Sequence, residues 1–216
     1  MVHLNFEQKL EMAREALTSQ LKDPTSAMET LDMLQQLGID YHFSEEIDTI
    51  TQSLYQIFST YNDSSISFMD SLQHVALGFR LLRQYGYYTC PDVFSRFMNK
   101  QGHFDVALCQ DLRGLLSLYE ASQMDIGEDI LYKANKFSAE NLQACIDHVG
   151  VEMGKKIKQA LEQPIHLSLP RNTSRQYICQ LQREHEMNNL FKEVAIMDFN
   201  YVQSLHESEF SEVLRW

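Results

Sequence analysis

The chain has 216 residues, of which 44% are hydrophobic, and its formal net charge is -12. That hydrophobic fraction can bury a core and argues against disorder, while only 8 Gly and 4 Pro favour helices over a many-turned β fold. The charge excludes a binder of duplex nucleic acid, because the densest basic stretch, at Lys155, Lys156 and Lys158, is too small to displace phosphate counterions. The apolar runs are too short to span a membrane.

Helix-capping signals punctuate the first third of the chain. Asn5 with Gln8 resembles a capping box. Pro24 opens a second helix, which Gly38 can close because glycine tolerates a left-handed conformation. Ser44 is placed as the N-cap of a third helix. Two apolar stripes at helical spacing accompany these signals: Leu10, Ala13, Leu17 and Leu21, and then Leu54, Ile57, Phe58 and Tyr61.

The rest of the chain continues in the same way. Ser67 with Asp70 is expected to start the next helix and Gly86 to end it, and Pro91 suits a first helical position. A further stripe consists of Leu112, Leu115, Leu116 and Tyr119. We therefore predict an all-α protein with about nine or ten helices joined by short loops, in a compact barrel or bundle.

Two features could form a binding site, and each also has a structural explanation. Arg80 and Arg83 lie one helical turn apart, so they could grip an anion or pair with acidic neighbours, and pairing is the preferred interpretation. An aromatic cluster could be a stacking surface, but helical spacing favours burial in the core. Its members are Tyr85, Tyr87, Tyr88, Phe94 and Phe97.

The cysteines and histidines form no metal or redox motif. Cys90, Cys109, Cys145 and Cys179 are too scattered for a CxxC unit, and we expect them to be small core residues in a reducing compartment. His185 is flanked by Glu184 and Glu186, but the second histidine of an HExxH motif is missing. We therefore predict that His185 is a surface residue.

Five phrases of the sequence together resemble plant class I terpene synthases, most closely those that make mono- and sesquiterpenes. They occur in the family's order and spacing and cover nearly the whole chain. The phrases are LDMLQQLGIDYHFSEEIDTITQSLY from Leu31, ALGFRLLRQYGYYTCPDVFSRF from Ala76, DLRGLLSLYEASQMDIGEDILYKA from Asp111, HLSLPRNTSRQYI from His166, and NNLFKEVAIMDFNYVQSLHESEFSEVLRW from Asn188.

The resemblance implies a fold and an activity. It implies a double-layered helical (α/α) barrel over residues 1–184, followed at residues 185–216 by the first helices of a truncated C-terminal bundle that is catalytic in the family. The parent enzyme would ionise and cyclise a prenyl diphosphate, geranyl or farnesyl diphosphate, with Mg²⁺ or Mn²⁺. The chain alone is expected to be inactive.

The family's functional motifs are not present in these 216 residues. The sequence contains no Asp-Asp pair, hence no Asp-Asp-x-x-Asp metal motif, no Arg-x-Arg pair and no Asp-x-Asp-Asp acid. Asn62-Asp63 begins like the second metal motif, but Ile66 and Asp70 stand where it needs Ser or Thr and Glu. We therefore assign no catalytic, substrate-binding or metal residue, and we expect this chain to bind no cofactor.

Other interpretations stay open beside this one. The chain could be a non-catalytic helical scaffold or interaction protein that retains only the N-terminal fold. A glycosidase would need two carboxylates across a cleft, and capping is the simpler role for Glu45 and Glu46.

Residues 188–216 would leave apolar faces in water and favour self-association. The absence of a visible transit peptide favours the cytoplasm, with a plastid location open if such a peptide has been lost.

Overall fold

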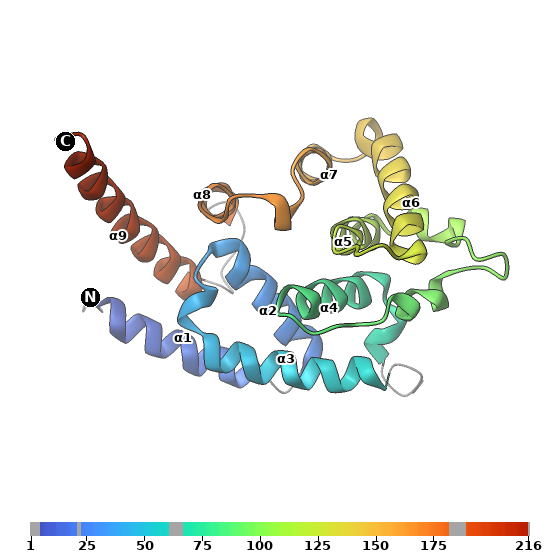
Figure 1. Ribbon diagram of the computed structural model, residues 1–216, viewed down its shortest axis with the longest axis horizontal. Helices are drawn as coiled ribbons and strands as arrows, with labels where there is room; N and C mark the ends of the chain where they lie inside the picture. Colours follow the sequence, from blue (N-terminus) through green and yellow to red (C-terminus); the bar gives the residue numbers. More distant parts are fainter. Residues whose placement is uncertain (1–4, 21–22, 61–66, 182–188, 216) are drawn as a thin grey trace. The chain divides into compact units, whose positions relative to one another are not determined.

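The computed structural model describes residues 5–20, 23–60, 67–181 and 189–215 (Figure 1). Within these ranges the chain forms nine α-helices and several short 3₁₀ helices, and an isolated bridge between Met98 and Phe104 is the one β interaction. This confirms the all-α prediction. The chain divides into two compact units. The first combines Met1–Asp48 with Leu169–Trp216, and the second is Thr49–Ser168.

Most helices belong to one unit, while α3 begins in the first and continues into the second. The first unit contains α1 (Phe6–Gln20), α2 (Pro24–Leu37), the 3₁₀ helix η1 (Asp40–His42), the start of α3 (Ser44–Ser59), α8 (Pro170–Leu181) and α9 (Asn189–Val213). The second contains η2 (Ser67–Asp70), α4 (Leu72–Gln84), η3 (Pro91–Phe97), η4 (Val106–Gln110), α5 (Leu112–Ser122), α6 (Asp129–Cys145), η5 (Ile146–His148), α7 (Val151–Glu162) and η6 (Ile165–Leu167).

The capping signals predicted for α1 and α2 are confirmed, whereas Ser44, predicted as the N-cap of the third helix, is the first residue of α3 itself. The backbone N–H of Gln8 donates to Asn5 Oδ1 at 2.8 Å, and the N–H of Asn5 donates to Gln8 Oε1 at 3.1 Å, which is a complete capping box. Asp23 caps α2 by accepting from the N–H of Ser26 at 3.0 Å. Gly38 ends α2 with φ +70°. A Cβ on Gly38 would lie 2.3 Å from Ser174 Oγ, so glycine also lets α8 approach.

Helices from the two ends of the sequence build the core of the first unit. Helix α1 packs against α9, and α2 packs against α8. Ala13 and Leu17 of the predicted α1 stripe are fully buried, whereas Leu21 of that stripe lies outside the described residues. Phe43, just before α3, meets Phe191 of α9 edge to face with ring centroids 6.2 Å apart. Apolar residues at both ends of the chain therefore share one core.

The second unit is built from consecutive helices, and its first boundary differs from the prediction. Ser67–Asp70 forms the separate 3₁₀ helix η2, and α4 begins only at Leu72. Ser71 is the actual N-cap, because its side chain accepts from the N–H of His74 at 3.4 Å. The pair Ser67 and Asp70 therefore marks the short helix η2 and not, as predicted, the start of α4. Gly86 follows the end of α4 with φ +83°, as predicted.

Helices α5, α6 and α7 share a hydrophobic cluster. Its buried members are Leu115, Tyr119, Leu142, Ile157 and Ala160. In the predicted α5 stripe, Leu115 and Tyr119 are buried, while Leu112 and Leu116 are only partly buried. None of the described helices combines the length and the hydropathy needed to cross a membrane.

Candidate functional site

Arg83 on α4 is fully engaged by protein groups. Its guanidinium donates to both carboxylate oxygens of Glu128, each at 2.6 Å, and also to the carbonyl oxygens of Thr89 and Met124. It stacks over Phe79, with the guanidinium carbon 4.4 Å from the ring centroid. These contacts confirm the pairing interpretation of Arg83 and leave its guanidinium no free edge for an anion.

Arg80, one turn earlier, is buried, and its Nη1 donates to Gln84 Oε1 at 2.7 Å. Glu120 of α5 is also buried, and its Oε2 accepts from the N–H of Ile165 at 2.9 Å. Burial, and secondarily the positive charge of Arg80, lowers the pKa of His166 below its ordinary value. Arg80 therefore belongs to the interior of the second unit and does not form an anion grip with Arg83.

The predicted aromatic cluster is only partly buried. Phe94 and Phe97 lie in the core, and Phe94 packs on Phe79 with centroids 5.0 Å apart. Tyr88, however, is 63% exposed and contacts the Arg83 guanidinium with its ring. The prediction of burial was wrong for Tyr88 because Tyr85–Cys90 is an irregular connection after α4, where helical spacing no longer applies.

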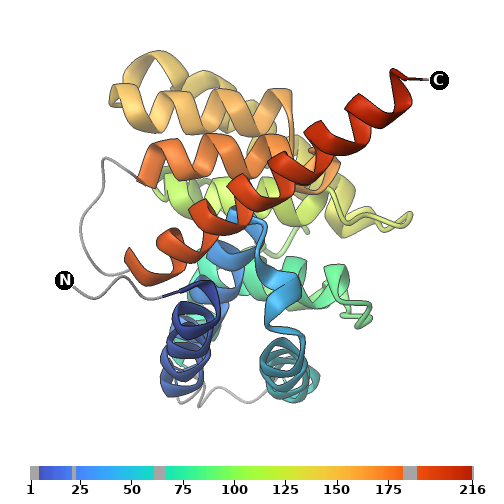
Figure 2. The same ribbon diagram turned by 90° about the vertical axis from the view of Figure 1, so that its left-hand side faces the viewer.

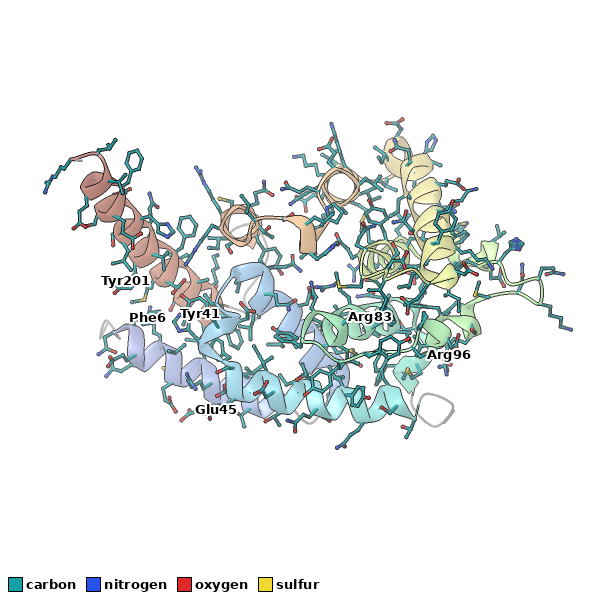
Figure 3. The ribbon with its side chains drawn as sticks, in the orientation of Figure 1. Phe6, Tyr41, Glu45, Arg83, Arg96 and Tyr201 are labelled. Atoms are coloured by element: carbon teal, nitrogen blue, oxygen red, sulfur yellow. The ribbon has the colours of Figure 1, made fainter. Side chains whose placement is uncertain are left out.

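A polar cluster in the first unit was not identified from the sequence. Asp198 of α9 is 3% exposed. Its Oδ1 accepts a hydrogen bond from the Tyr41 hydroxyl and lies 3.0 Å from His42 Nε2, while its Oδ2 lies 3.4 Å from Arg171 Nη1. We call these four residues the Asp198 cluster. Figure 3 shows Tyr41 beside the start of α9, with Tyr201 farther along the helix.

The surroundings of Asp198 keep the Tyr41 hydroxyl protonated, so that it can donate a hydrogen bond. Burial, then the hydrogen bond and the charge of Asp198, raises the pKa of Tyr41 to about 12, although Arg171 opposes the shift. Tyr41 therefore keeps its proton and donates. His42 faces the carboxylate with Nε2 and packs against Phe6 with ring centroids 5.5 Å apart. Both carboxylate oxygens are occupied, which explains how α9 can bury an acidic group.

The other sequence candidates do not form a site. Glu45 and Glu46 lie in the first turn of α3, where Glu46 accepts from Arg14 Nη1 at 3.3 Å, so they are not opposed across a cleft. Asn62-Asp63 and His185 with its flanking glutamates lie outside the described residues.

The cysteines differ from their prediction. Cys179 is exposed, and Cys90, Cys109 and Cys145 are only partly buried, so none is a core residue. Cys109 Sγ lies 3.0 Å from Asn141 Oδ1. Burial raises the pKa of both Cys90 and Cys109. Their thiols are therefore poor nucleophiles at neutral pH.

The described residues do not offer a site for Mg²⁺. No three His, Cys, Asp or Glu side chains gather among them where they could hold a metal ion. The most buried carboxylate, Asp198, already accepts hydrogen bonds at both oxygens. Since Mg²⁺ needs several free oxygen ligands, we derive no chemical step through that ion for the described part of the chain.

The family described as "Terpene synthase, N-terminal domain" matches residues 3–161. The chain is 39% identical over 210 residues to valencene synthase of Vitis vinifera, covering 96% of this chain and 37% of the relative. It is 37% identical over 210 residues to a chloroplastic trans-ocimene synthase of Litsea cubeba, covering 97% and 35%.

A solved structure agrees with these sequence matches. Isoprene synthase from grey poplar leaves (Populus x canescens), in complex with three Mg²⁺ ions and dimethylallyl-S-thiolodiphosphate, matches 98% of this chain and 41% of its own chain. The TM-score is 0.87 at 28% identity. The chain therefore belongs to the terpene synthase family. It spans little more than a third of the length of the curated relatives that it matches.

Proposed function

We propose that these 216 residues are the N-terminal portion of an enzyme that ionises and cyclises a prenyl diphosphate, geranyl or farnesyl diphosphate, with Mg²⁺ or Mn²⁺. The observation that carries the proposal is the match of nearly the whole chain to a terpene synthase structure that holds Mg²⁺ ions and a diphosphate analogue. The division between residues 1–184 and 185–216 stays a prediction, because that boundary falls in 182–188, outside the described residues.

The described residues support a structural role for this portion. Ionising a prenyl diphosphate requires metal ions at the leaving group and a dry cavity for the carbocation. Among the described residues, the Arg83 guanidinium is instead bound by Glu128, and the Asp198 carboxylate is bound by its three donors. The chain would therefore contribute a folded support, while catalysis would depend on residues that it does not contain.

A chimera tests this proposal. Residues 1–216 would replace the matching portion of valencene synthase, and the product would be incubated with geranyl and farnesyl diphosphate plus Mg²⁺. We expect terpene products from the chimera and none from the 216-residue chain, which is the matched control. A folded but inactive chimera would favour the scaffold alternative. Product formation by the short chain alone would show that it carries a site of its own.

We also propose that the isolated chain self-associates through the second half of α9. The large exposed apolar side chains there are Tyr201, Leu205, Phe210 and Val213, and the exposed Leu214 follows the end of the helix. Burying each such side chain stabilises a complex by roughly 1.5–3 kcal/mol. Light scattering over a range of concentrations should show a dimer for the wild type and a monomer for Phe210→Ser. Tyr132→Ser, at an exposed tyrosine of the second unit, is the control, and an equally monomeric wild type would reject the proposal.

A further inference from the structure

Asp198 lies where α9 changes from a buried to an exposed helix. On its N-terminal side, Phe191, Val194 and Ala195 are buried in the first unit. On its C-terminal side, from residue 203 to residue 215, every residue is exposed. Figure 2 shows α9 from the side, and its last turns extend past the other helices of the first unit. The Asp198 cluster is therefore the last fixed point before the helix projects.

The apolar contacts of α9 are less directional than its polar ones. We therefore expect the packing of Phe191, Val194 and Ala195 alone to restrain rotation of the helix less than directional hydrogen bonds do. Hydrogen bonds to a carboxylate are directional and charge-assisted. The Asp198 donors come from two other elements, Tyr41 and His42 from η1 and Arg171 from α8. Together they restrain rotation and tilt at one point.

A second polar contact lies nearer the start of the helix. Lys9 of α1 pairs with Glu193 of α9, with Nζ 3.0 Å from Oε2. Glu193 is about half exposed, so this pair adds little free energy. Because the pair joins α1 to α9, its distance depends on where the two helices lie relative to each other.

We propose that the Asp198 cluster is a latch that sets the rotation and exit direction of α9, making Asp198 a positioning residue for the exposed half of that helix. Releasing the latch should free α9 from η1 and α8 while the second unit stays folded. Replacing the carboxylate with an amide leaves Tyr41, His42 and Arg171 facing a neutral group that cannot accept as many charge-assisted bonds.

Hydrogen exchange with mass spectrometry tests the release of α9. In Asp198→Asn we expect the amides of residues 189–198 to exchange about tenfold faster or more, with no change in α5. Glu209→Gln, the same acid-to-amide change on the exposed part of α9, is the matched control and should behave as the wild type. Equal acceleration in α5 and α9 would mean general destabilisation and would overturn the latch, as would no acceleration at all.

A zero-length carbodiimide cross-link tests position separately from stability. The carbodiimide converts the Glu193 carboxylate to an O-acylisourea, and the Lys9 amine attacks its carbonyl carbon, which forms the amide and releases the urea. We expect a Lys9–Glu193 link in the wild type and in Glu209→Gln, and a yield at least about threefold lower in Asp198→Asn. An unchanged yield would overturn the proposal. If Asp198→Asn fails to fold, Tyr41→Phe takes its place, because it removes a single hydroxyl. We expect it to raise exchange in residues 189–198 and lower the cross-link yield by smaller amounts. If neither quantity changes in Tyr41→Phe, the latch is also overturned.

Discussion

The two units of this protein are assembled in different ways. The second unit is one continuous segment, and its main ion pair joins Arg83 to Glu128, 45 residues apart. The first unit needs both ends of the chain, and the Tyr41–Asp198 hydrogen bond joins residues 157 apart. Closing the longer loop costs more conformational entropy, although the cost grows slowly with length. From this difference we expect the first unit to need α8 and α9 in order to fold, and the second unit to fold without them.

The largest expected effect comes from removing α9. A chain ending at residue 188 loses the buried Phe191, Val194 and Ala195, so the first unit should be destabilised by at least about 3 kcal/mol. Hydrogen exchange should show protection lost in α1 and α2 but kept in α4 and α5. A chain ending at residue 200 retains the buried residues and is the control. If the shorter chain still protects α1, the dependence of the first unit on both ends is wrong.

Local structure was predictable where the signal lay within a few residues. The Asn5–Gln8 capping box and the Gly38 helix end are sequence-local, and both were predicted. Tyr88 was misplaced because helical spacing was extended past Gly86, where the backbone leaves the helix. The start of α4 was misplaced because Ser67 and Ser71 carry the same type of capping signal.

The Asp198 cluster could not be predicted from the sequence, because its members are far apart along the chain. Its partners Tyr41 and His42 are more than 150 residues away, so no spacing rule joins them to Asp198. One signal was available, since Asp198 lies on the same helical face as Phe191, Val194 and Ala195. A single carboxylate on an apolar stripe predicts a buried acid that needs donors. It does not say which residues supply them.

Substitutions at two glycines should distinguish the cost of backbone strain from the cost of overpacking. Gly38 and Gly86 both have positive φ, but a Cβ would meet Ser174 Oγ only at Gly38 and would meet nothing within 4 Å at Gly86. Gly86→Ala should therefore cost about 1 kcal/mol from the left-handed backbone alone. Gly38→Ala should cost about 2–4 kcal/mol because overpacking against α8 is added. Urea unfolding measures both, and equal costs would mean that α8 can move away from α2 freely.

Alkaline pH should weaken the first unit through the contact between Tyr41 and Asp198. Burial and the contact with Asp198 raise the pKa of Tyr41 to about 12, against an ordinary value of 10.0. The unfolded chain releases this proton first, so the stabilisation is complete below pH 10 and is lost as pH rises towards 12. Exchange protection in α1, compared between pH values after correction for intrinsic rates, should fall over this window. Tyr41→Phe should flatten the fall, and Tyr132→Phe, in the second unit, should leave it as in the wild type.

Acidic pH should weaken the second unit instead, by a smaller amount. Burial, and then the positive charge of Arg80, lowers the pKa of His166 below 6.5. The unfolded chain therefore takes up this proton first, so stability that is present above pH 6.5 is lost as pH falls below it. His166 Nδ1 is buried without a hydrogen-bond partner, which makes a charged ring still less favourable there. Exchange protection in α4 and α5 should decline below pH 6.5, and His166→Gln should reduce that decline without altering α1. A decline of equal size in the wild type and the variant would assign the acid sensitivity to another group and remove this contrast between the units.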